Sequence, residues 1–209
     1  MKTLRAASRR SGSTWAGILA CCMLAGCAST PAPHFYTLGS QPSVNQPTRI
    51  KQSGPAGAGV TIASLTIPEL VDRPQLVLRS SGNRVSVLDN QRWAESLKTG
   101  IARVLATNLA DQLATSAVGL PTVRSTRKGD VTVSIDITRF DSTLNGIVRI
   151  DARWTVRGAA DAPASSGDAS AQEPGGATID EVVAAYDRAL AQIADALART
   201  VRQVVAGGH

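Results

Sequence analysis

Cysteine, histidine and aromatic residues are scarce in this chain of 209 residues, which has three cysteines, two histidines and 3% aromatic residues. Two cysteines, Cys21 and Cys22, lie in an N-terminal apolar stretch, and the third is Cys27. If the chain is cut before Cys27 and that thiol is acylated, no internal disulfide can form, so the fold must depend on a packed core. The two histidines, His34 and His209, form no cluster with the spacing of a metal site, and no free cysteine nucleophile remains.

Motifs of the common catalytic and nucleotide-binding folds are also missing. The chain has no G-x-S-x-G elbow, no phosphate-cradling glycine loop and no H-E-x-x-H pair. Asp136 and Asp151 could face each other across a hairpin, but both alternate with arginines, which is typical of solvated cross-strand ion pairs. We therefore expect a protein that is not an enzyme and that needs no cofactor or metal.

The N-terminus has the build of a bacterial lipoprotein signal. Four basic residues precede an apolar stretch, Trp15 to Leu24, that is too short to span a bilayer permanently. The lipobox Leu24-Ala25-Gly26-Cys27 closes this stretch, so residues 1–26 are expected to be removed and Cys27 to carry acyl chains. An aspartate after the cysteine usually retains a lipoprotein in the inner membrane. The alanine found there, Ala28, favours the periplasmic side of the outer membrane.

Loss of the signal changes the charge of the chain. Of its 22 basic and 16 acidic residues, four basic and no acidic ones lie in residues 1–26, so the mature chain keeps 18 against 16, or +2. This small excess removes the case for a nucleic-acid binder. Residues 27–34 form a lipidated tether, whose part from 28 to 33 reaches about 20 Å at most. The single domain of residues 35–206 is thus expected to sit close to the lipid headgroups.

The domain is expected to begin with short strands and a long loop. Phe35–Leu38 is β-prone, and residues 39–59 are rich in Pro, Gly, Ser and Gln, as in an irregular loop. Val60–Ile67 has apolar residues in both phases, which predicts a central strand covered on two sides. Gln75–Arg79 and Arg84–Leu88 predict a hairpin.

The period of apolar residues changes to that of a helix over Arg92–Ala114. Spacings of three and four between large apolar residues predict an amphipathic helix of about six turns that starts before Trp93. Asp89 or Asn90 is the expected N-cap. The apolar side of this helix is expected to face the core, because it has too few large apolar residues to lie in a bilayer surface.

The clearest pattern in the chain is a pair of alternating runs, Val131–Ile137 and Val148–Val156. Asn145-Gly146 between them predicts a hairpin with a type I′ turn, and Phe140 is out of phase with Ile137, which indicates a bulge. This hairpin should have one dry face and one polar face.

The C-terminal part is expected to hold a loop and a second long helix. Residues 159–176 are rich in Ala, Ser, Gly and Pro and are interpreted mainly as a flexible loop, with a weak edge strand at 167–172 as the alternative. Thr178 and Glu181 form a capping box for a helix from Ile179 to about Val205. Strands interleaved with two long helices predict an α/β sandwich of a mixed β-sheet with two long helices. Its helices should cover one sheet face and leave the polar face of the hairpin open.

Three arginines share the polar phase of the second hairpin strand, at intervals of about 13 Å. The simple interpretation of Arg149, Arg153 and Arg157 is a solubilising surface. The alternative is a docking surface for acidic groups of a partner protein or of anionic lipids, which guanidinium groups suit well.

Several local strings resemble one family, the ABC-type transport auxiliary lipoproteins, a group that includes the paraquat-inducible protein C subunit. The strings are Phe35-Tyr36-Thr37-Leu38, Leu70-Val71-Asp72-Arg73-Pro74-Gln75-Leu76-Val77 with Arg79, Arg92-Trp93-Ala94-Glu95, and Phe140, Gly146 and Trp154. The resemblance covers essentially the whole mature chain and departs from the family in residues 159–176, where such proteins tend to carry a clearer strand.

The resemblance implies a non-catalytic outer-membrane subunit of a lipid-transport system that docks a periplasmic mammalian-cell-entry (MCE) domain protein. The fold it implies is similar to the N-terminal domain of TolB, an anticodon-binding-domain-like sandwich. Within the matching strings, Arg73 is a candidate partner-binding residue, although the turn at Pro74 gives this segment a structural role as well. A homo-oligomer is compatible with this family. Two other functions stay open: an assembly factor for outer-membrane proteins or lipopolysaccharide, and a lipoprotein hydrolase.

Overall fold

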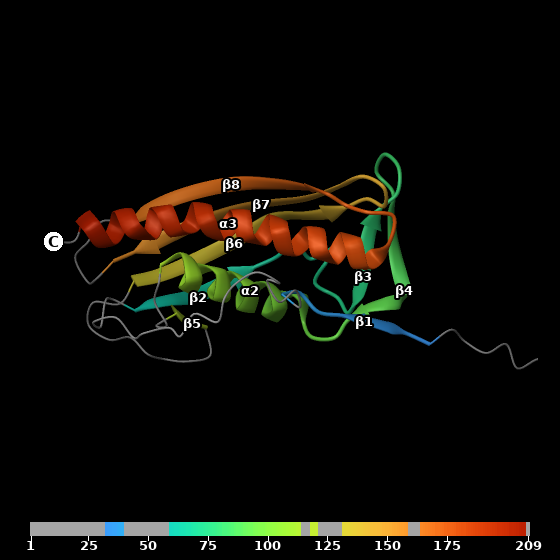
Figure 1. Cartoon of the computed structure of the whole chain (residues 1–209), viewed down its shortest axis with the longest axis horizontal. Helices are drawn as coiled ribbons and strands as arrows, with labels where there is room; N and C mark the ends of the chain where they lie inside the picture. The colour runs from blue at the N-terminus through green and yellow to red at the C-terminus, as the bar shows by residue number, and fades with distance from the viewer. Residues whose placement is uncertain (1–31, 40–58, 114–117, 121–130, 159–163, 208–209) are drawn as a thin grey trace, which may run out of the picture. The chain divides into compact units, whose positions relative to one another are not determined.

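Two mixed β-sheets and two long α-helices make up the described part of the chain (Figure 1). This structure, a computed structural model, describes residues 32–39, 59–113, 118–120, 131–158 and 164–207. The predicted signal, Cys27 and most of the predicted loop 39–59 lie outside these residues. The elements are β1 (His34–Tyr36), β2 (Val60–Thr66), β3 (Gln75–Arg79), β4 (Val85–Trp93), α2 (Leu97–Gln112), β5 (Val118–Gly119), β6 (Val131–Ser142), β7 (Ile147–Arg157), β8 (Ser165–Pro174) and α3 (Ile179–Gly207).

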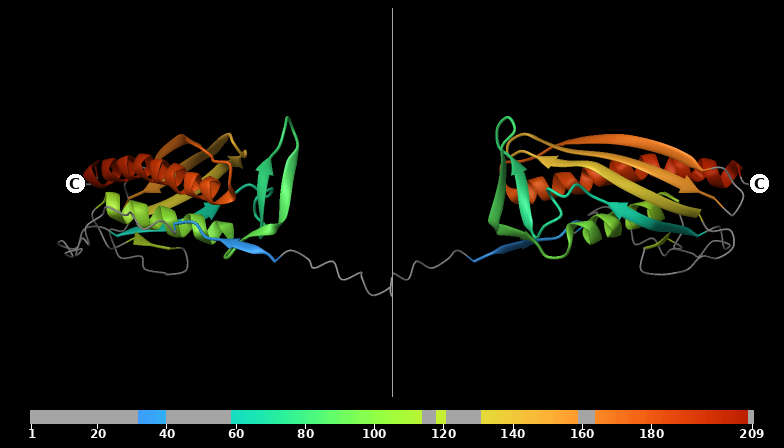
Figure 2. Two further views of the ribbon diagram at one scale, coloured as in Figure 1. Left: turned by 45° about the vertical axis from the view of Figure 1, so that its right-hand side comes forward. Right: turned by 180° about the vertical axis from the view of Figure 1, so that it is seen from behind.

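The sandwich expected from the sequence is confirmed, with its strands divided between two sheets. One has the order β1-β4-β3 and the other β5-β2-β6-β7-β8. Parallel pairs join β1 to β4, β5 to β2 and β2 to β6, and the remaining neighbours are antiparallel. Helices α2 and α3 pack on one face of the five-stranded sheet, α2 over β2 and β5 and α3 over β7 and β8 (Figure 1). The opposite face carries no helix of the described chain (Figure 2).

Strand β2 is covered on one face only, so the prediction of two-sided cover is wrong. Val60, Ile62 and Leu65 are buried, whereas Ala63 and Thr66 are exposed. The pairing with β6 skips Ala63, which is therefore a β-bulge that shifts the phase of the strand. Apolar residues in both phases of the sequence come from this shift.

The predicted start of the first helix is also wrong, because β4 runs on to Trp93 and α2 begins at Leu97. Asp89 and Asn90 lie within β4 and cap nothing, and the N-cap is Ser96, which makes no side-chain cap hydrogen bond. Trp93 is paired with Tyr36 of β1. Its buried side chain meets Tyr186 of α3 edge to face, with ring centroids 6.5 Å apart. Pairing with a strand distant in sequence thus overrides the helical period of this segment.

The hairpin of β6 and β7 is confirmed, as are the hairpin of β3 and β4 and the bulge before Phe140, which leaves Thr138 unpaired in the register. The turn is not of type I′. Asn145 has a positive φ of 54°, but the φ of Gly146 is not positive. The connection spans four residues, 143–146, and the Gly146 N–H donates to the Thr143 carbonyl at 3.1 Å.

Residues 165–174, interpreted mainly as loop, form the ten-residue edge strand β8. This strand has almost no large side chains to signal it, but it pairs with β7 along its whole length. The capping box that opens α3 is confirmed: the Glu181 N–H donates to Thr178 Oγ1 at 3.3 Å, and the Thr178 N–H donates to Glu181 Oε2 at 3.0 Å.

The chain after β1 is hydrogen-bonded to both helices. Leu38 is 2% exposed within the core. The Gly39 N–H donates to Asp187 Oδ1 of α3 at 2.7 Å, and the Arg103 guanidinium of α2 donates to the Leu38 carbonyl at 2.8 Å. Gly39 has a φ of 69°, and a Cβ there would come within 2.8 Å of Val104, so this turn requires glycine. We call residues 37–39 the strap.

Candidate functional site

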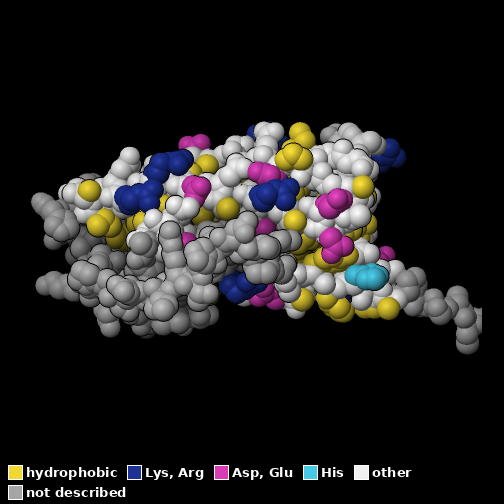
Figure 3. Space-filling model, in the orientation of Figure 1, with side chains coloured by type: hydrophobic (Ala, Val, Ile, Leu, Met, Phe, Trp, Pro, Cys, Tyr) yellow, Lys and Arg dark blue, Asp and Glu magenta, His cyan; other side chains and the backbone are white. Residues whose placement is uncertain are grey.

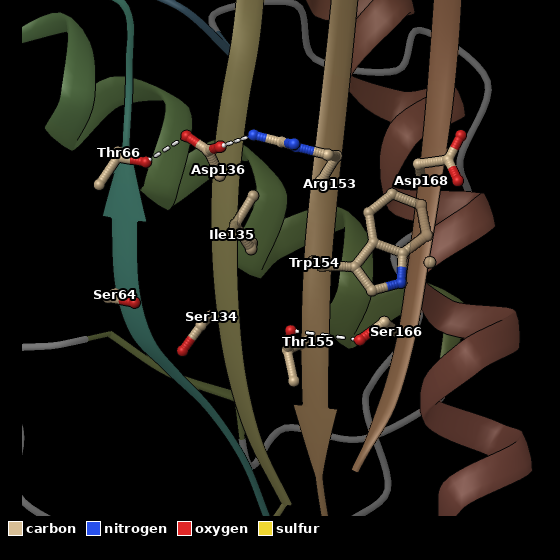
Figure 4. Close-up of a pocket in the computed structure, with 11 residues that line it drawn as sticks. Ser64, Thr66, Ser134, Ile135, Asp136, Arg153, Trp154, Thr155, Ser166 and Asp168 are labelled. Carbon is tan, nitrogen blue, oxygen red and sulfur yellow. Dashed lines mark hydrogen bonds and ion pairs between the residues drawn. The ribbon is translucent and has the colours of Figure 1, made fainter.

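The uncovered face of the five-stranded sheet is the candidate site, and we call it the open face. Side chains alternate between the two faces of a strand, so the polar residues of β7 and those of β6 before its last residue point away from the helices. Ser142, the last residue of β6, is buried beside Tyr186 of α3. Register aligns them in rows across four strands (Figure 4). One row is Thr66, Asp136, Arg153 and Asp168, and the next is Ser64, Ser134, Thr155 and Ser166.

Asp136 holds the centre of the charged row. Its two oxygens accept from Thr66 Oγ1 at 2.6 Å and from the Arg153 guanidinium at 2.7 Å (Figure 4). The Thr66 hydrogen bond and then the Arg153 pair hold the pKa of Asp136 below its ordinary value. The side chains of Arg153 and Asp136 are 67% and 47% exposed, so this pair adds little to stability. The pair instead holds the Arg153 guanidinium in one position on the open face.

A second set of ion pairs continues along the same face toward the β6–β7 turn. Asp151 lies 3.2 Å from Arg139 and 3.1 Å from Arg149. Burial alone would raise the pKa of Asp151, but hydrogen bonds from Ser170 and Arg149 outweigh it and the pKa is lowered. Asp141 is 2.8 Å from Arg79, which joins β3 to β6 and raises the pKa of that arginine.

The hydroxyl row is flat, since none of its four side chains is larger than threonine. Thr155 and Ser166 lie 3.4 Å apart at their oxygens, across the β7–β8 pair. The two rows line an open hollow of about 610 Å³. Its breadth and lack of walls suit a surface of another macromolecule better than an enclosed small ligand.

Beneath the hollow, Trp154 fixes the edge strand. Its indole is 4% exposed and donates to Thr200 Oγ1 of α3 at 3.1 Å. Gly167 of β8 lies against the ring: a Cβ there would come 2.7 Å from Trp154 Nε1. Glycine at this position lets β8 approach close enough to complete both rows.

The structure brings three of the four predicted partner-binding residues together and leaves one, Arg73, apart. Arg149, Arg153 and Arg157 lie in line on β7, on the open face. Arg153 pairs with Asp136 across the β6–β7 ladder, as expected of a cross-strand ion pair, whereas Arg149 pairs with Asp151 two residues further along the same strand. Arg157 is exposed and forms no ion pair with a described residue. Arg73 lies in the turn before β3, at the other end of that strand from Arg79, and Cys27 lies outside the described residues.

Other members of the site could not be assigned from the sequence. The sequence predicts mainly loop for Asp168 and Ser166, with Asp168 inside the alternative weak edge strand at 167–172, because β8 lacks apolar alternation. Arg79 and Asp141 meet only through contact of β3 with β6, which no local pattern signals. Within the described ranges there is no group of three potential metal ligands, and none of the described helices is long and apolar enough to cross a membrane.

Two solved structures share this fold. One, described as an uncharacterised protein, superposes with a TM-score of 0.64 at 17% identity, over 82% of this chain and 99% of its own. A protein from Xanthomonas campestris superposes with a TM-score of 0.57 at 16% identity, over 85% and 96%. No curated protein matches the chain.

The family model for the ABC-type transport auxiliary lipoprotein component matches residues 36–198. This span starts within β1, ends within α3 and includes the whole open face. The chain therefore belongs to the ABC-type transport auxiliary lipoproteins, as the strings in its sequence predicted.

Proposed function

We propose that this lipoprotein is the non-catalytic, outer-membrane-anchored periplasmic subunit of an MCE-type intermembrane lipid transport system. In this role it docks the MCE-domain protein through the open face and so supports the integrity of the outer membrane. Family membership supports an auxiliary role in ABC-type transport. The lipobox and Ala28 support the anchor and its membrane. The family resemblance supplies the MCE partner.

The uncovered sheet face is the main observation that supports a docking role. A sheet face without polar side chains is normally buried against another layer. The open face is uncovered, and it presents two polar rows in register across its strands. Arg149 and Arg153 are already held by Asp151 and Asp136, so ordering these two side chains on binding would cost little entropy. Preformed ion pairs with a hydroxyl row beside them match the polar, hydrogen-bonded composition of non-obligate protein interfaces.

Capture of the MCE-domain protein by the intact lipoprotein in phospholipid nanodiscs tests this proposal. The informative variant combines Arg157→Glu with Ser166→Arg, because both side chains are exposed and neither is in an ion pair with a described residue. We expect the Kd to rise by at least about tenfold, since misplaced charges across an interface cost several kcal/mol. The matched control is Arg199→Glu, on the exposed side of α3, which should bind as wild type.

Equal binding by the two variants would show that the open face does not dock this partner. Capture of a β-barrel protein in place of the MCE-domain protein would instead favour an assembly factor. For the anchor, cell fractionation of the Cys27→Ser variant should place the chain outside the outer-membrane fraction, and its expression should fail to restore detergent resistance to a deletion strain.

A further inference from the structure

The exposed apolar side chains of the domain gather at one end. The six large hydrophobic residues that remain exposed in the described chain lie on β1, on the turn before β3, on β4, and at the β6–β7 connection. These elements share one end of the unit Pro33–His209 (Figures 1 and 2), and Figure 3 shows apolar side chains there in yellow. The residues are Phe35, Leu70, Val85, Val87, Leu144 and Ile147.

Three of these side chains lie on the same face of the three-stranded sheet. Register places Phe35 beside Arg92 and the neighbouring Tyr36 beside the buried Trp93. Since alternate side chains point to opposite faces, Phe35 and Arg92 point away from the core.

The β3–β4 hairpin continues this face through Gln75, which pairs with Arg92 and precedes the buried Leu76, although the register shifts there and leaves residues 89–91 of β4 unpaired with β3. Leu76 and Leu78 are buried, and the pairs Val77–Val87 and Arg79–Val85 alternate with them. Phe35, Val85, Val87 and Arg92 therefore lie on the outer side of the sheet, which we call the anchor-side face.

The anchor-side face combines apolar and basic groups. Phe35 is 62% exposed, and Val85 and Val87 are 36% and 38% exposed. Strands β1, β3 and β4 with the turn between β3 and β4 contain three arginines and one carboxylate, Asp89. Arg79 is paired with Asp141 of β6, which leaves Arg84 and Arg92 as the basic groups of this face. Exposed apolar residues beside arginines fit a phospholipid surface, where side chains enter the acyl boundary and guanidinium groups meet phosphates.

Chain connectivity brings this face to lipid. Phe35 is eight residues after Cys27, so a fully extended chain holds it within about 28 Å of the acylated residue. The strap fixes the chain after β1 to α2 and α3, so Phe35 and the three-stranded sheet move together with the rest of the domain. We propose that the anchor-side face lies against the phospholipid surface to which Cys27 is attached, with Phe35 and Val87 in contact with lipid. The open face is then left free at the side for a protein partner.

Single-cysteine labelling tests this contact directly, because the mature chain keeps no unmodified cysteine once Cys27 is acylated. Phe35→Cys and Val87→Cys chains, purified as intact lipoproteins, receive a small fluorophore and enter vesicles of phosphatidylethanolamine and phosphatidylglycerol. Some lipids carry a quencher at the top of the acyl chain. The control is Gln203→Cys, at the exposed C-terminal end of α3.

We expect quenching of labels at positions 35 and 87 several-fold above that at position 203, at one protein per vesicle. Adding Phe35→Asp to the Val87→Cys chain should lower the quenching at 87 toward the control, because a carboxylate is expelled from the acyl boundary. Equal quenching at all three positions would overturn the proposal. Quenching at positions 35 and 87, or shielding of these labels from water, that appears only at high protein density would also overturn the proposal. Such a result would favour a second copy of the chain covering the face. Capture of an MCE-domain protein is a separate measurement, so either proposal can fail alone.

Discussion

The close contact between Gly167 and Trp154 gives the sharpest stability prediction. A Cβ at Gly167 would lie 2.7 Å from Nε1, 2.9 Å from Cε2 and 3.0 Å from Cζ2 of the indole. Gly167→Ala must therefore push the ring or β8 aside. Forcing one methyl group into a packed core costs about 1–3 kcal/mol. Movement of the ring also strains the buried hydrogen bond to Thr200, which is worth about 1 kcal/mol.

Alanine also lowers the entropy of the unfolded chain, which offsets about 0.4–1 kcal/mol of this loss. The expected net loss in the free energy of unfolding is about 2 kcal/mol. Urea unfolding followed by tryptophan fluorescence measures it. Gly119→Ala in β5 is the matched control, because a Cβ there meets only Thr61 Oγ1 at 3.6 Å, an ordinary contact. In a Trp154→Phe background, Gly167→Ala should lower the free energy of unfolding by less, because the phenyl ring lacks the indole nitrogen that the added Cβ would meet. If Gly167→Ala is as stable as Gly119→Ala, the close packing of β8 on Trp154 is refuted.

Three further predictions concern single residues outside the open face. Thr178→Ala should lower the free energy of unfolding by about 1 kcal/mol in urea titrations because it removes the N-cap acceptor, whereas Thr178→Ser should retain it. Asn145→Val should lower Tm, because a left-handed φ costs a β-branched residue about 1–2 kcal/mol, and Asn145→Gly should not; equal melting of both variants would contradict this. Burial raises the pKa of Asp187, so the folded protein binds this proton more tightly than the unfolded chain does. The stabilisation by the protonated carboxyl is complete below the ordinary aspartate pKa and is lost as the pH rises through the raised value. Asp187→Asn should therefore gain stability relative to wild type as pH rises through this range in pH-dependent unfolding, and a parallel pH profile would argue against it.

Elements with strong local signals could be predicted from the sequence. The β6–β7 hairpin alternates without interruption up to Ile137, and α3 has both a capping box and a continuous apolar stripe. The face left open followed from the same alternation, so the placement of Arg149, Arg153 and Arg157 together on it was predictable.

The remaining features depend on contacts between distant segments. Trp93 satisfies the apolar spacing of a helix, yet parallel pairing with β1 makes it the end of a strand. Strand β8 consists mainly of Ser, Ala and Gly, whose weak β-propensity is overcome by pairing with β7 and by the fit of Gly167 against Trp154. The bulge at Ala63 hides the one-sided burial of β2, because a single skipped residue inverts the phase of the rest of the strand. Local periodicity carries no information on such pairings.

The strap has a mechanical consequence for a protein held at its N-terminus. In the arrangement proposed above, a pull on the Cys27 anchor reaches the domain through residue 33 and meets the parallel β1–β4 ladder first. It then meets the buried Leu38 side chain and the hydrogen bonds from Arg103 and Gly39, which transmit it to both helices. Tension exerted by a bound partner is therefore shared by the whole sandwich, and the three residues of β1 do not have to resist it alone.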